Sequence, residues 1–309
     1  MQPLDRPTFY FIGVSTGKSS INQVFPEWMR ILGEQAVLVG YDAPLHAAAE
    51  VYREIVEHIK ADPLARGALV TTHKLDLLNA CRDLFDFLDP YAELCAEVSC
   101  IAKRDGKLEG YAKDPISSGR TWQSFIPAGH FGETKAEVLC LGSGGAAVAT
   151  SVFLANRPDI ADRPARFTLV DVSQERLDHA REIHGGLKTD IEFRYLLNAD
   201  AVENDRLMAG LPPGSVVINA TGMGKDRPGS PITDAGLFPQ GGYAWEFNYR
   251  GELNFLHQAR RQVATRNLTV EDGWVYFLHG WTQVVAQVFQ IDLTADVFAR
   301  LDGAASALR

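Results

Sequence analysis

Ala136-Glu-Val-Leu-Cys-Leu-Gly-Ser-Gly-Gly-Ala-Ala147 joins an apolar strand to a helix of small residues through a glycine-rich turn. The turn Gly142-Ser-Gly-Gly-Ala-Ala147 has the spacing G-x-G-x-x-A. The first glycine of this pattern permits a tight turn, the second lets backbone approach a pyrophosphate, and the small third position allows close packing of helix on strand. The stretch therefore predicts a Rossmann-type turn that binds a dinucleotide.

A carboxylate, Asp171, ends the next predicted strand, Phe167-Thr-Leu-Val-Asp171. Its distance from the turn suits the acidic residue that accepts hydrogen bonds from the cofactor ribose. A carboxylate there also repels a 2′-phosphate, so Asp171 predicts NAD in preference to NADP. The alternative is a structural glycine turn with an aspartate that caps the following helix. The residues expected to bind the pyrophosphate through the helix N-terminus are Gly142, Ser143, Gly144, Gly145 and Ala146.

A second glycine-containing loop, Gly222-Met-Gly224, follows the predicted strand Ser215–Ala220. Parallel α/β sheets bind ligands beyond the carboxyl ends of their strands. We therefore expect this loop to contact the nicotinamide side of the cofactor. An ordinary loop after a strand is the alternative.

Strand and helix patterns alternate along the chain, which predicts an α/β fold. Before residue 100 the predicted strands are Thr8–Val14, Val37–Tyr41 and Gly67–Thr72. After Lys135 they are Ala136–Leu141, Arg166–Val170, Ile191–Leu196, Ser215–Ala220 and Tyr243–Phe247. Two predicted helices, Gly273–Gln290 and Thr294–Leu308, are expected to fold back on the first domain. The expected domains are an N-terminal α/β substrate or catalytic domain (residues 1–116 and 268–309) and a Rossmann NAD(P)-binding domain (residues 117–267).

The composition excludes several classes of partner. The 309 residues are 46% hydrophobic and carry a formal net charge of −9, with Lys and Arg scattered along the chain. This pattern argues against nucleic acid or an anionic membrane as a partner. No segment approaches the roughly 20 apolar residues of a membrane span, and the N-terminus does not resemble a signal peptide. We expect a cytoplasmic protein with a small-molecule substrate, and a homodimer as its assembly.

The cysteines predict neither a metal site nor a disulfide framework. The four of them are Cys81, Cys95, Cys100 and Cys140. They form no C-x-x-C pair and have no zinc-ligand spacing with histidine. We expect buried free thiols and no bound metal.

The order of these motifs resembles the shikimate dehydrogenase family over most of the chain. The resemblance implies a catalytic domain, a Rossmann domain and C-terminal helices that return to the first domain. Lys74, in Val70-Thr-Thr-His-Lys74, falls at the family's catalytic lysine. Asp114, in Gly110-Tyr-Ala-Lys-Asp114, falls at its catalytic aspartate. The implied activity is that of an NAD(P)-dependent alcohol dehydrogenase of the shikimate or quinate type, a family linked to aromatic amino acid biosynthesis.

Further positions follow the family's order of motifs. Asn219-Ala-Thr221 matches an Asn-Ala-Thr stretch beside the cofactor, and Tyr249-Arg250 resembles a Tyr-x-Pro segment. Gly273 matches the glycine of a late Asp-Gly motif. The cofactor contacts expected in this part of the chain are Asn219, Thr221, Gly222, Met223 and Gly273.

The departures from the family fall on groups that hold shikimate. A Ser-x-Ser pair becomes Ser19 and Ile21, an Asn-Thr pair becomes Ser99 and Cys100, and a late Gln becomes Gly280. Each lost hydrogen-bond partner costs about 1–3 kcal/mol, so we expect a retained reaction on a changed substrate, a cyclic hydroxy acid or polyol. Other departures are Thr72 for Pro, Ala112 for Asn, and Asp171-Val-Ser for a basic cofactor loop. The residues expected to bind the substrate are Lys18, Ser19, Ser99, Tyr249 and Gln283.

The loop Gly13-Val-Ser-Thr-Gly-Lys-Ser19 invites comparison with a phosphate-binding P-loop. Only three residues separate its glycines, whereas a P-loop needs four. We expect it to face the substrate, with a plain Gly/Ser turn as the alternative.

Lys74 and Asp114 together suit hydride transfer at an alcohol carbon. The hydroxyl proton must leave as the hydride departs, and a lysine with a lowered pKa can accept it. The alternatives are a solvated lysine at a helix start and an aspartate that caps a helix before Pro115. Two other functions stay open: an NAD enzyme acting on an unrelated cyclitol or hydroxy acid, and a non-catalytic NAD-binding or sensing protein that has lost its substrate site.

Overall fold

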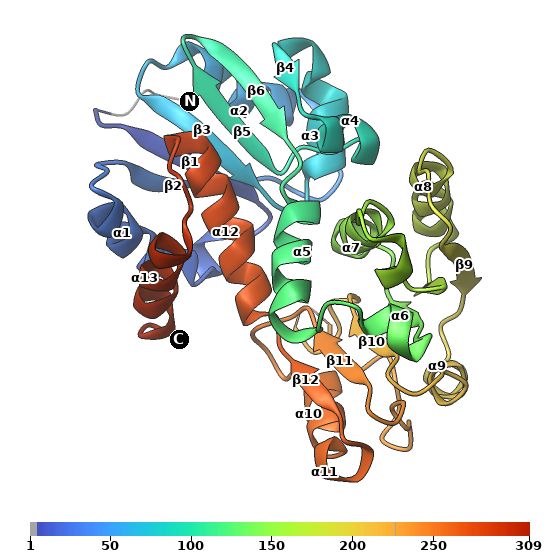
Figure 1. Ribbon diagram of the computed structural model, residues 1–309. Helices are drawn as coiled ribbons and strands as arrows, with labels where there is room; N and C mark the ends of the chain where they lie inside the picture. The colour runs from blue at the N-terminus through green and yellow to red at the C-terminus, as the bar shows by residue number, and fades with distance from the viewer. Residues whose placement is uncertain (1–4, 226) are drawn as a thin grey trace. The chain divides into compact units, whose positions relative to one another are not determined.

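The computed structural model describes residues 5–225 and 227–309. The chain divides into two compact units (Figure 1). The first contains Met1–Lys113 together with Gly280–Arg309, and the second contains Asp114–His279. From the sequence, we expected residues 268–279 to accompany the first of these units.

The first unit is built on a mixed six-stranded sheet of order β2-β1-β3-β5-β6-β4. β1 is parallel to β2 and β3, whereas β5 is antiparallel to β3 and β6. The sequence analysis did not predict the β5–β6 hairpin. The strands are β1 (Thr8–Gly13), β2 (Val37–Asp42), β3 (Ala65–Val70), β4 (Phe87–Leu88), β5 (Cys100–Arg104) and β6 (Lys107–Tyr111).

Alternating side chains of β1 supply both faces of this sheet. Tyr10 and Ile12 join the core beneath two helices, while the Phe9 ring lies 5.4 Å from that of Phe25 in a third helix. The helices of this unit are α1 (Ile21–Leu32), α2 (Ala49–Ala61), α3 (Lys74–Cys81), α4 (Pro90–Cys95), the second half of α12 (Trp274–Phe289) and α13 (Ala295–Ser306).

The C-terminal segment packs against the first helix of the chain. The Trp28 indole in α1 donates a hydrogen bond to the Leu301 carbonyl in α13 at 2.8 Å. Earlier in the segment, the Trp281 ring of α12 lies 4.8 Å from that of Phe11. These contacts confirm the prediction that the terminal helices return to the first unit.

The second unit contains an all-parallel sheet of order β12-β11-β10-β7-β8-β9. The order reverses between β7 and β10, as in the Rossmann fold, where a dinucleotide binds across the point of reversal. The predicted fold class is therefore confirmed. The strands are β7 (Val138–Leu141), β8 (Arg166–Asp171), β9 (Glu192–Leu197), β10 (Val216–Asn219), β11 (Tyr243–Glu246) and β12 (Thr269–Glu271).

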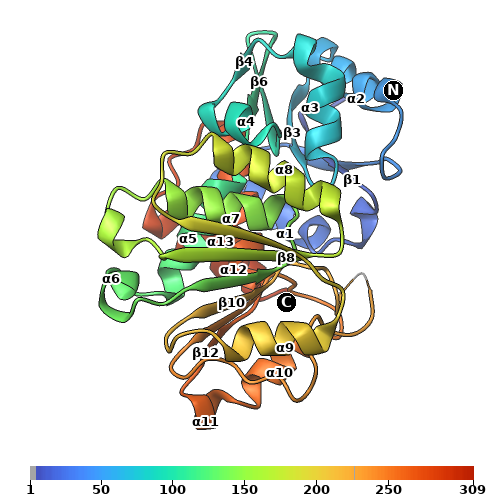
Figure 2. The same cartoon turned by 90° about the vertical axis from the view of Figure 1, so that its right-hand side faces the viewer.

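Helices cover both faces of this parallel sheet. Met208 of α9 and Phe255 of α10 pack in one core with Leu139 and Val217 of the strands, so α9 and α10 share a face (Figure 2). The helices are α5 (Asp114–Phe125), α6 (His130–Thr134), α7 (Gly145–Ala155), α8 (Gln174–Gly185), α9 (Ala201–Ala209), α10 (Asn254–Arg260) and α11 (Val263–Arg266).

The strand β12 and the ring contacts of Trp274 with Tyr249 and of Tyr276 with Trp245 tie residues 268–279 to the second unit. The three residues of β12 pair with β11, Trp245 opposite Glu271, and extend the sheet by one strand. Such a short strand has too few residues to show an alternating pattern.

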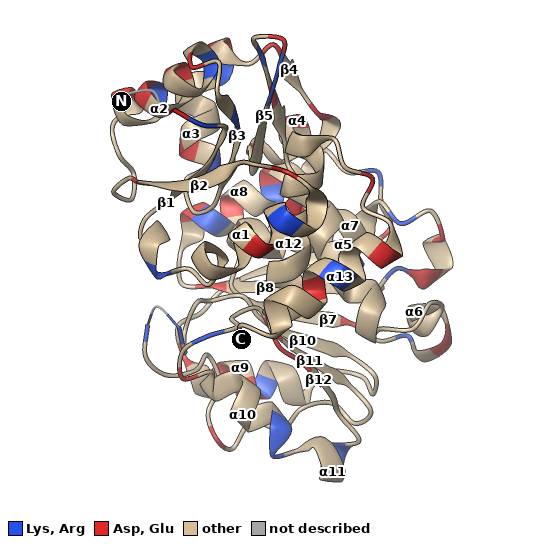
Figure 3. Ribbon diagram, turned by 90° about the vertical axis from the view of Figure 1, so that its left-hand side faces the viewer, with Lys and Arg blue, Asp and Glu red and all other residues tan. Residues whose placement is uncertain are grey.

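Charges and cysteines follow the sequence-based expectations. Acidic and basic residues are interspersed along both units (Figure 3). All four cysteines are buried free thiols. Within the described residues, no helix has the length and apolarity to cross a membrane, and no cluster of His, Cys, Asp or Glu could hold a metal ion.

Candidate cofactor and active-site residues

The two spaced glycines of the turn, Gly142 and Gly144, have different structural roles. Gly142 has φ of 105°, and a Cβ atom there would lie 2.7 Å from the carbonyl of Ala220. Gly144 has an ordinary φ of −71°, and a Cβ there would meet nothing within 4 Å. Gly142 is therefore required by the fold, whereas Gly144 leaves open space at the N-terminus of α7. That space suits a bound pyrophosphate.

Asp171 ties the end of β8 to this turn. Its side chain is 7% exposed. One carboxylate oxygen accepts hydrogen bonds from the Ser143 N–H at 2.7 Å and the Ser143 hydroxyl at 3.0 Å. The other accepts from the Ser173 N–H at 2.9 Å. The helix-capping role weighed as an alternative for Asp171 belongs instead to Ser173, whose hydroxyl accepts from the Arg176 N–H at 3.4 Å. Asp171 holds the glycine turn, and its ribose contact stays a prediction.

The loop after β10 is held by its own side chains. Asn219 is fully buried, and its Oδ1 accepts hydrogen bonds from the Thr221 N–H at 3.1 Å and the Thr221 hydroxyl at 2.7 Å. The Thr221 hydroxyl in turn accepts from the Met223 N–H at 3.1 Å. Asn219 therefore shapes the loop, while the half-buried residues Thr221, Gly222 and Met223 form its outer part.

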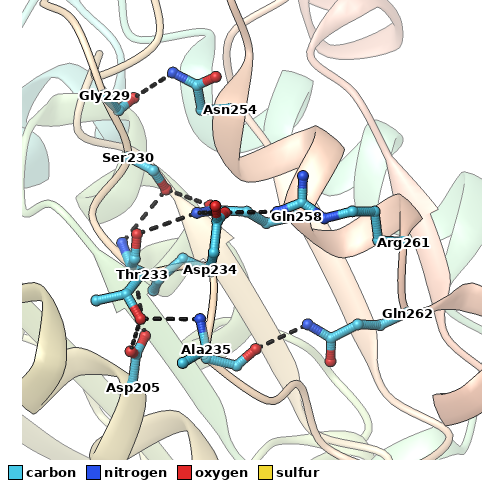
Figure 4. A network of polar contacts seen from close by, with 12 residues as sticks. Asp205, Gly229, Ser230, Thr233, Asp234, Ala235, Asn254, Gln258, Arg261 and Gln262 are labelled. Atoms are coloured by element: carbon cyan, nitrogen blue, oxygen red, sulfur yellow. Dashed lines mark hydrogen bonds and ion pairs between the residues drawn. The ribbon is translucent and has the colours of Figure 1, made fainter.

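The far end of the same loop is fixed by the network in Figure 4. Asn254 of α10 donates to the Gly229 carbonyl at 3.4 Å, and Ser230 donates to Gln258 of α10 at 2.6 Å. The Thr233 N–H donates to Asp205 of α9 at 3.0 Å. Residues 219–224 are thus followed by a segment anchored to two helices.

Gly273 occupies a position with no room for a side chain. A Cβ there would lie 2.1 Å from the carbonyl oxygen of Phe247, just past the end of β11. The Tyr249 ring lies 4.5 Å from that of Phe277 and 5.9 Å from that of Trp274. These contacts give both predicted residues packing roles beside the carboxyl end of β11, and their ligand contacts stay predictions.

Glu246 is a functional candidate that the sequence reasoning missed. It ends β11 and is fully buried. Its carboxylate accepts from Asn219 Nδ2 at 2.7 Å, from Asn248 N–H at 2.8 Å and from Asn248 Nδ2 at 2.7 Å. Burial raises the pKa of Glu246 to about 7, against the lowering effect of these hydrogen bonds. A glutamate at the end of the apolar run Tyr243-Ala-Trp-Glu246 was the available signal.

The two predicted catalytic residues both begin helices. Lys74 is half-buried at the start of α3 in the first unit. His73 before it is buried and its Nδ1 contacts the Tyr52 hydroxyl at 3.1 Å. Asp114 is half-buried at the start of α5 in the second unit. Their approach to one another stays a prediction.

Ser99 is engaged by the backbone of the first unit. It is 2% exposed, and its hydroxyl accepts from the Lys113 N–H at 2.7 Å and donates to the Tyr111 carbonyl at 3.4 Å. The Lys113 ammonium, also missed from the sequence, donates to Gln287 at 2.6 Å and lies 4.6 Å from the centre of the Tyr111 ring. Burial lowers the pKa of Lys113.

The remaining predicted substrate contacts of the first unit lie nearer solvent. Lys18 is exposed at the end of a short 3-10 helix, Thr16–Lys18. Ser19 is half-buried, and its hydroxyl accepts from the Ile21 N–H at 3.5 Å. Gln283 is half-buried on α12, one helical turn from Gln287.

Known proteins resemble this chain in both sequence and fold. No family model matches it. A shikimate dehydrogenase (NADP⁺) from Bacillus cereus is 32% identical over 145 residues, which cover 46% of this chain and 47% of the relative. One from Lactococcus lactis is 29% identical over 182 residues, covering 58% and 59%. The chain thus aligns with about half the length of these curated relatives.

Solved structures match over nearly the whole chain. A shikimate dehydrogenase in complex with NADP⁺ has a TM-score of 0.73 at 18% identity and covers 99% of this chain and 97% of its own. Quinate dehydrogenase from Corynebacterium glutamicum in complex with NAD has a TM-score of 0.72 at 16% identity, covering 98% and 99%. A ligand-free 5-ketofructose reductase from Gluconobacter has a TM-score of 0.72 at 18% identity and covers 99% of this chain and 100% of its own.

The sheet order and glycine turn of the second unit define a protein with a Rossmann-type nucleotide-binding fold. The chain is similar in sequence to curated shikimate dehydrogenases over about half its length, and it shares the fold of solved shikimate dehydrogenases.

Proposed function

We propose that this protein is an NAD(P)-dependent oxidoreductase that transfers a hydride between NAD(H) and a secondary alcohol or ketone of a cyclic hydroxy acid or polyol other than shikimate. The observation that carries the proposal is the open space at Gly144, at the switch point of a parallel sheet and the start of α7. Backbone N–H groups at a helix start bind phosphate, and glycine without a side chain lets the phosphate approach.

Two features of the β8 end support NAD as the preferred coenzyme. Asp171 places a buried negative charge where the ribose of a dinucleotide lies in this fold. Val172 follows it and is 60% exposed, so it offers an apolar surface where a 2′-phosphate would need a cation. Relatives of this chain include a structure with NADP⁺ and another with NAD, so the fold accommodates either coenzyme and side chains decide the preference.

Lys74 and Asp114 are proposed to carry out the proton transfer that accompanies hydride transfer. When bound, the nicotinamide accepts or supplies the hydride. Lys74 would take the hydroxyl proton as the alcohol is oxidised and return it to the carbonyl oxygen in the reverse direction. Asp114 would orient the lysine ammonium and the substrate hydroxyl. The positional match of both residues to the family's pair supports these roles.

Four positions support a substrate other than shikimate. Ile21 and Cys100 are fully buried where the family has hydrogen-bonding side chains. The Ser99 hydroxyl is occupied by backbone groups. Lys113 places an ammonium where the family's Gly-Tyr-Asn-Thr-Asp pattern has threonine. Lys18, Ser19, Tyr249 and Gln283 remain the proposed contacts for the new substrate.

The test begins with calorimetric titration of NAD and of NADP into the protein. We expect NAD to bind more tightly. A panel of cyclic hydroxy acids and polyols then follows, with turnover read from the absorbance of the reduced nicotinamide. The failure of both coenzymes to bind would overturn the proposal. Tight NAD binding without turnover across the panel would favour the non-catalytic NAD-binding or sensing function instead. Light scattering of the same sample tests the expected homodimer.

A further inference from the structure

A buried polar cluster joins the carboxyl ends of β10 and β11. Asn219 lies opposite Glu246 in the register of these parallel strands. The Asn219 amide donates to the Glu246 carboxylate at 2.7 Å. Asn248, two residues past the strand end, donates to the same carboxylate through its backbone N–H and its side chain at 2.8 and 2.7 Å. Glu246 thus accepts three hydrogen bonds in a site closed to water.

The orientation of both amide side chains follows from their other partners. The Asn219 oxygen faces the Thr221 N–H at 3.1 Å, which can only donate, so its nitrogen must face Glu246. The Asn248 nitrogen lies 3.2 Å from the Met223 carbonyl, which can only accept, so this nitrogen also donates to Glu246. Every neighbour of the carboxylate is therefore a donor, and the site fits an ionised glutamate.

The same cluster determines the shape of the loop at residues 219–224. Asn219 holds the N–H and the hydroxyl of Thr221, and Thr221 holds the Met223 N–H. Asn248 holds the Met223 carbonyl at 3.2 Å. Both chains of hydrogen bonds lead from the Glu246 carboxylate to Met223. A proton on Glu246 would face a donor on either oxygen and would break at least one of the three contacts.

We propose that Glu246 is a positioning residue: its ionised carboxylate holds the Asn219–Gly224 loop in the conformation that receives the nicotinamide half of the coenzyme, and its protonation releases the loop. The assignment of this loop to the nicotinamide rests on the proposed function. The hydrogen-bond pattern that links Glu246 to Met223 does not.

The surroundings of Glu246 set its pKa within the pH range in which the protein can be studied. Burial raises its pKa to about 7, and the positive charge of Lys225, in the loop after β10, acts in the opposite direction. β10 carries no titratable side chain. The neighbouring elements carry further titratable or charged side chains, among them Glu271 in β12, Asp272 in the turn after it, Tyr276 in α12, and the exposed residues His257 and Arg260 in α10.

The first experiment measures hydrogen exchange of the peptide covering residues 221–225 in the coenzyme-free protein at pH 6 and pH 8, corrected for intrinsic exchange. We expect protection at pH 8 to exceed that at pH 6 by roughly tenfold, since the loop loses a charge-assisted hydrogen bond on protonation. Glu246→Gln presents an NH₂ group to the donors, as a protonated carboxyl would, and should show low protection at both pH values.

The second experiment measures the Kd of NAD at the same two pH values. The wild-type protein should bind roughly tenfold more weakly at pH 6, and Glu246→Gln should bind weakly at both. Glu182→Gln removes an exposed carboxylate from α8 and should reproduce the wild-type profiles. The wild-type profiles need no substitution, so they test the proposal even if Glu246→Gln does not fold.

The outcomes separate this proposal from the proposed function. NAD binding that is equally tight at pH 6 and pH 8 in the wild-type protein would overturn the role of Glu246 and leave the coenzyme assignment standing. Loop protection that does not change with pH would also overturn it. If the loop follows pH as expected but neither NAD nor NADP binds, the proposed function fails and the coenzyme role of Glu246 fails with it.

Discussion

The carboxylate of Asp171 accepts hydrogen bonds from both the N–H and the hydroxyl of Ser143, at 2.7 and 3.0 Å. A residue chosen from the sequence for a ribose contact therefore also fixes the turn that precedes it. Asp171→Asn brings an NH₂ group towards these donors, so we expect a loss of about 1–2 kcal/mol in the free energy of unfolding together with weaker NAD binding. Denaturant unfolding and calorimetry measure the two effects, and Asp178→Asn, at an exposed position of α8, serves as the control. Full stability in Asp171→Asn would contradict the structural role.

Val172→Arg tests the basis of the coenzyme preference without disturbing the turn. Val172 is 60% exposed, so the longer side chain meets little packing. A guanidinium beside the ribose site can bind a 2′-phosphate through charge-assisted hydrogen bonds. We expect the Kd of NADP to fall by roughly tenfold or more, while that of NAD changes little. An unchanged Kd of NADP, with NAD still bound, would place the ribose elsewhere.

The two spaced glycines of the turn should respond to alanine in opposite ways. In Gly142→Ala the new Cβ meets the Ala220 carbonyl, and φ of 105° strains any L side chain, so we expect a loss of more than about 2 kcal/mol in stability. Gly144→Ala meets nothing within 4 Å at φ of −71° and should leave the melting temperature unchanged. It should nevertheless weaken NAD binding at least tenfold, because its methyl group would occupy the space of the pyrophosphate.

Measurements of stability and of NAD affinity on both variants decide whether Gly142 serves the fold and Gly144 the pyrophosphate. Gly144→Ala with unchanged affinity for NAD would show that the pyrophosphate does not lie at this turn, whatever the behaviour of Gly142→Ala.

Local sequence patterns were sufficient to predict the Rossmann sheet and the glycine turn. The run before Gly142 and the strand ending at Asp171 each carry a periodicity or a spacing that depends on neighbours in sequence. The return of the C-terminal segment also followed from the order of motifs. In contrast, β12 depends on pairing with β11, a strand more than 20 positions earlier, which no local pattern encodes. The β5–β6 hairpin did carry a local signal that the sequence analysis missed, the Asp105-Gly106 turn between its strands.

The same distinction explains which candidate residues were missed. The role of Glu246 arises from the register of β11 against β10, which places it opposite Asn219. Lys113 is buried against Gln287, 174 positions later in the chain. Contacts between side chains so far apart follow from tertiary packing, so a single sequence gives only their residue types.

Lys74→Ala tests the proposed proton transfer. Removing a general acid or base lowers turnover by about 100-fold or more, so we expect such a loss in kcat on a true substrate with little change in NAD affinity. Lys107→Ala, at an exposed position of β6, is the matched control and should retain full turnover. A loss of less than tenfold in Lys74→Ala, with folding intact, would remove Lys74 from the mechanism.

Two buried groups of the second unit should make stability depend on pH in opposite directions. His184 is 6% exposed and contacts Ser151 and the Tyr195 hydroxyl at 2.7 and 2.8 Å. Burial lowers its pKa from 6.5 to about 4, so its contribution is fully present above pH 6.5 and is lost as pH falls towards 4. Burial raises the pKa of Glu246 from 4.5 to about 7, so its contribution to the free energy of unfolding is fully present below pH 4.5 and is lost as pH rises through 7. This global effect is opposite in sign to the local ordering of the Asn219–Gly224 loop that we propose for the ionised carboxylate.

Between pH 5 and pH 6.5 the free energy of unfolding rises with pH through His184 and falls with pH through Glu246, each by about 1.4 kcal/mol per pH unit. Relative to the wild-type protein, Glu246→Gln should therefore gain about 2 kcal/mol of stability on going from pH 5 to pH 6.5, and His184→Gln should lose about 2 kcal/mol. Urea unfolding of the three proteins at both pH values measures these differences, and the comparison cancels every other titrating group. Equal pH slopes in Glu246→Gln and the wild-type protein would show that Glu246 titrates in the folded state as it does in the unfolded chain.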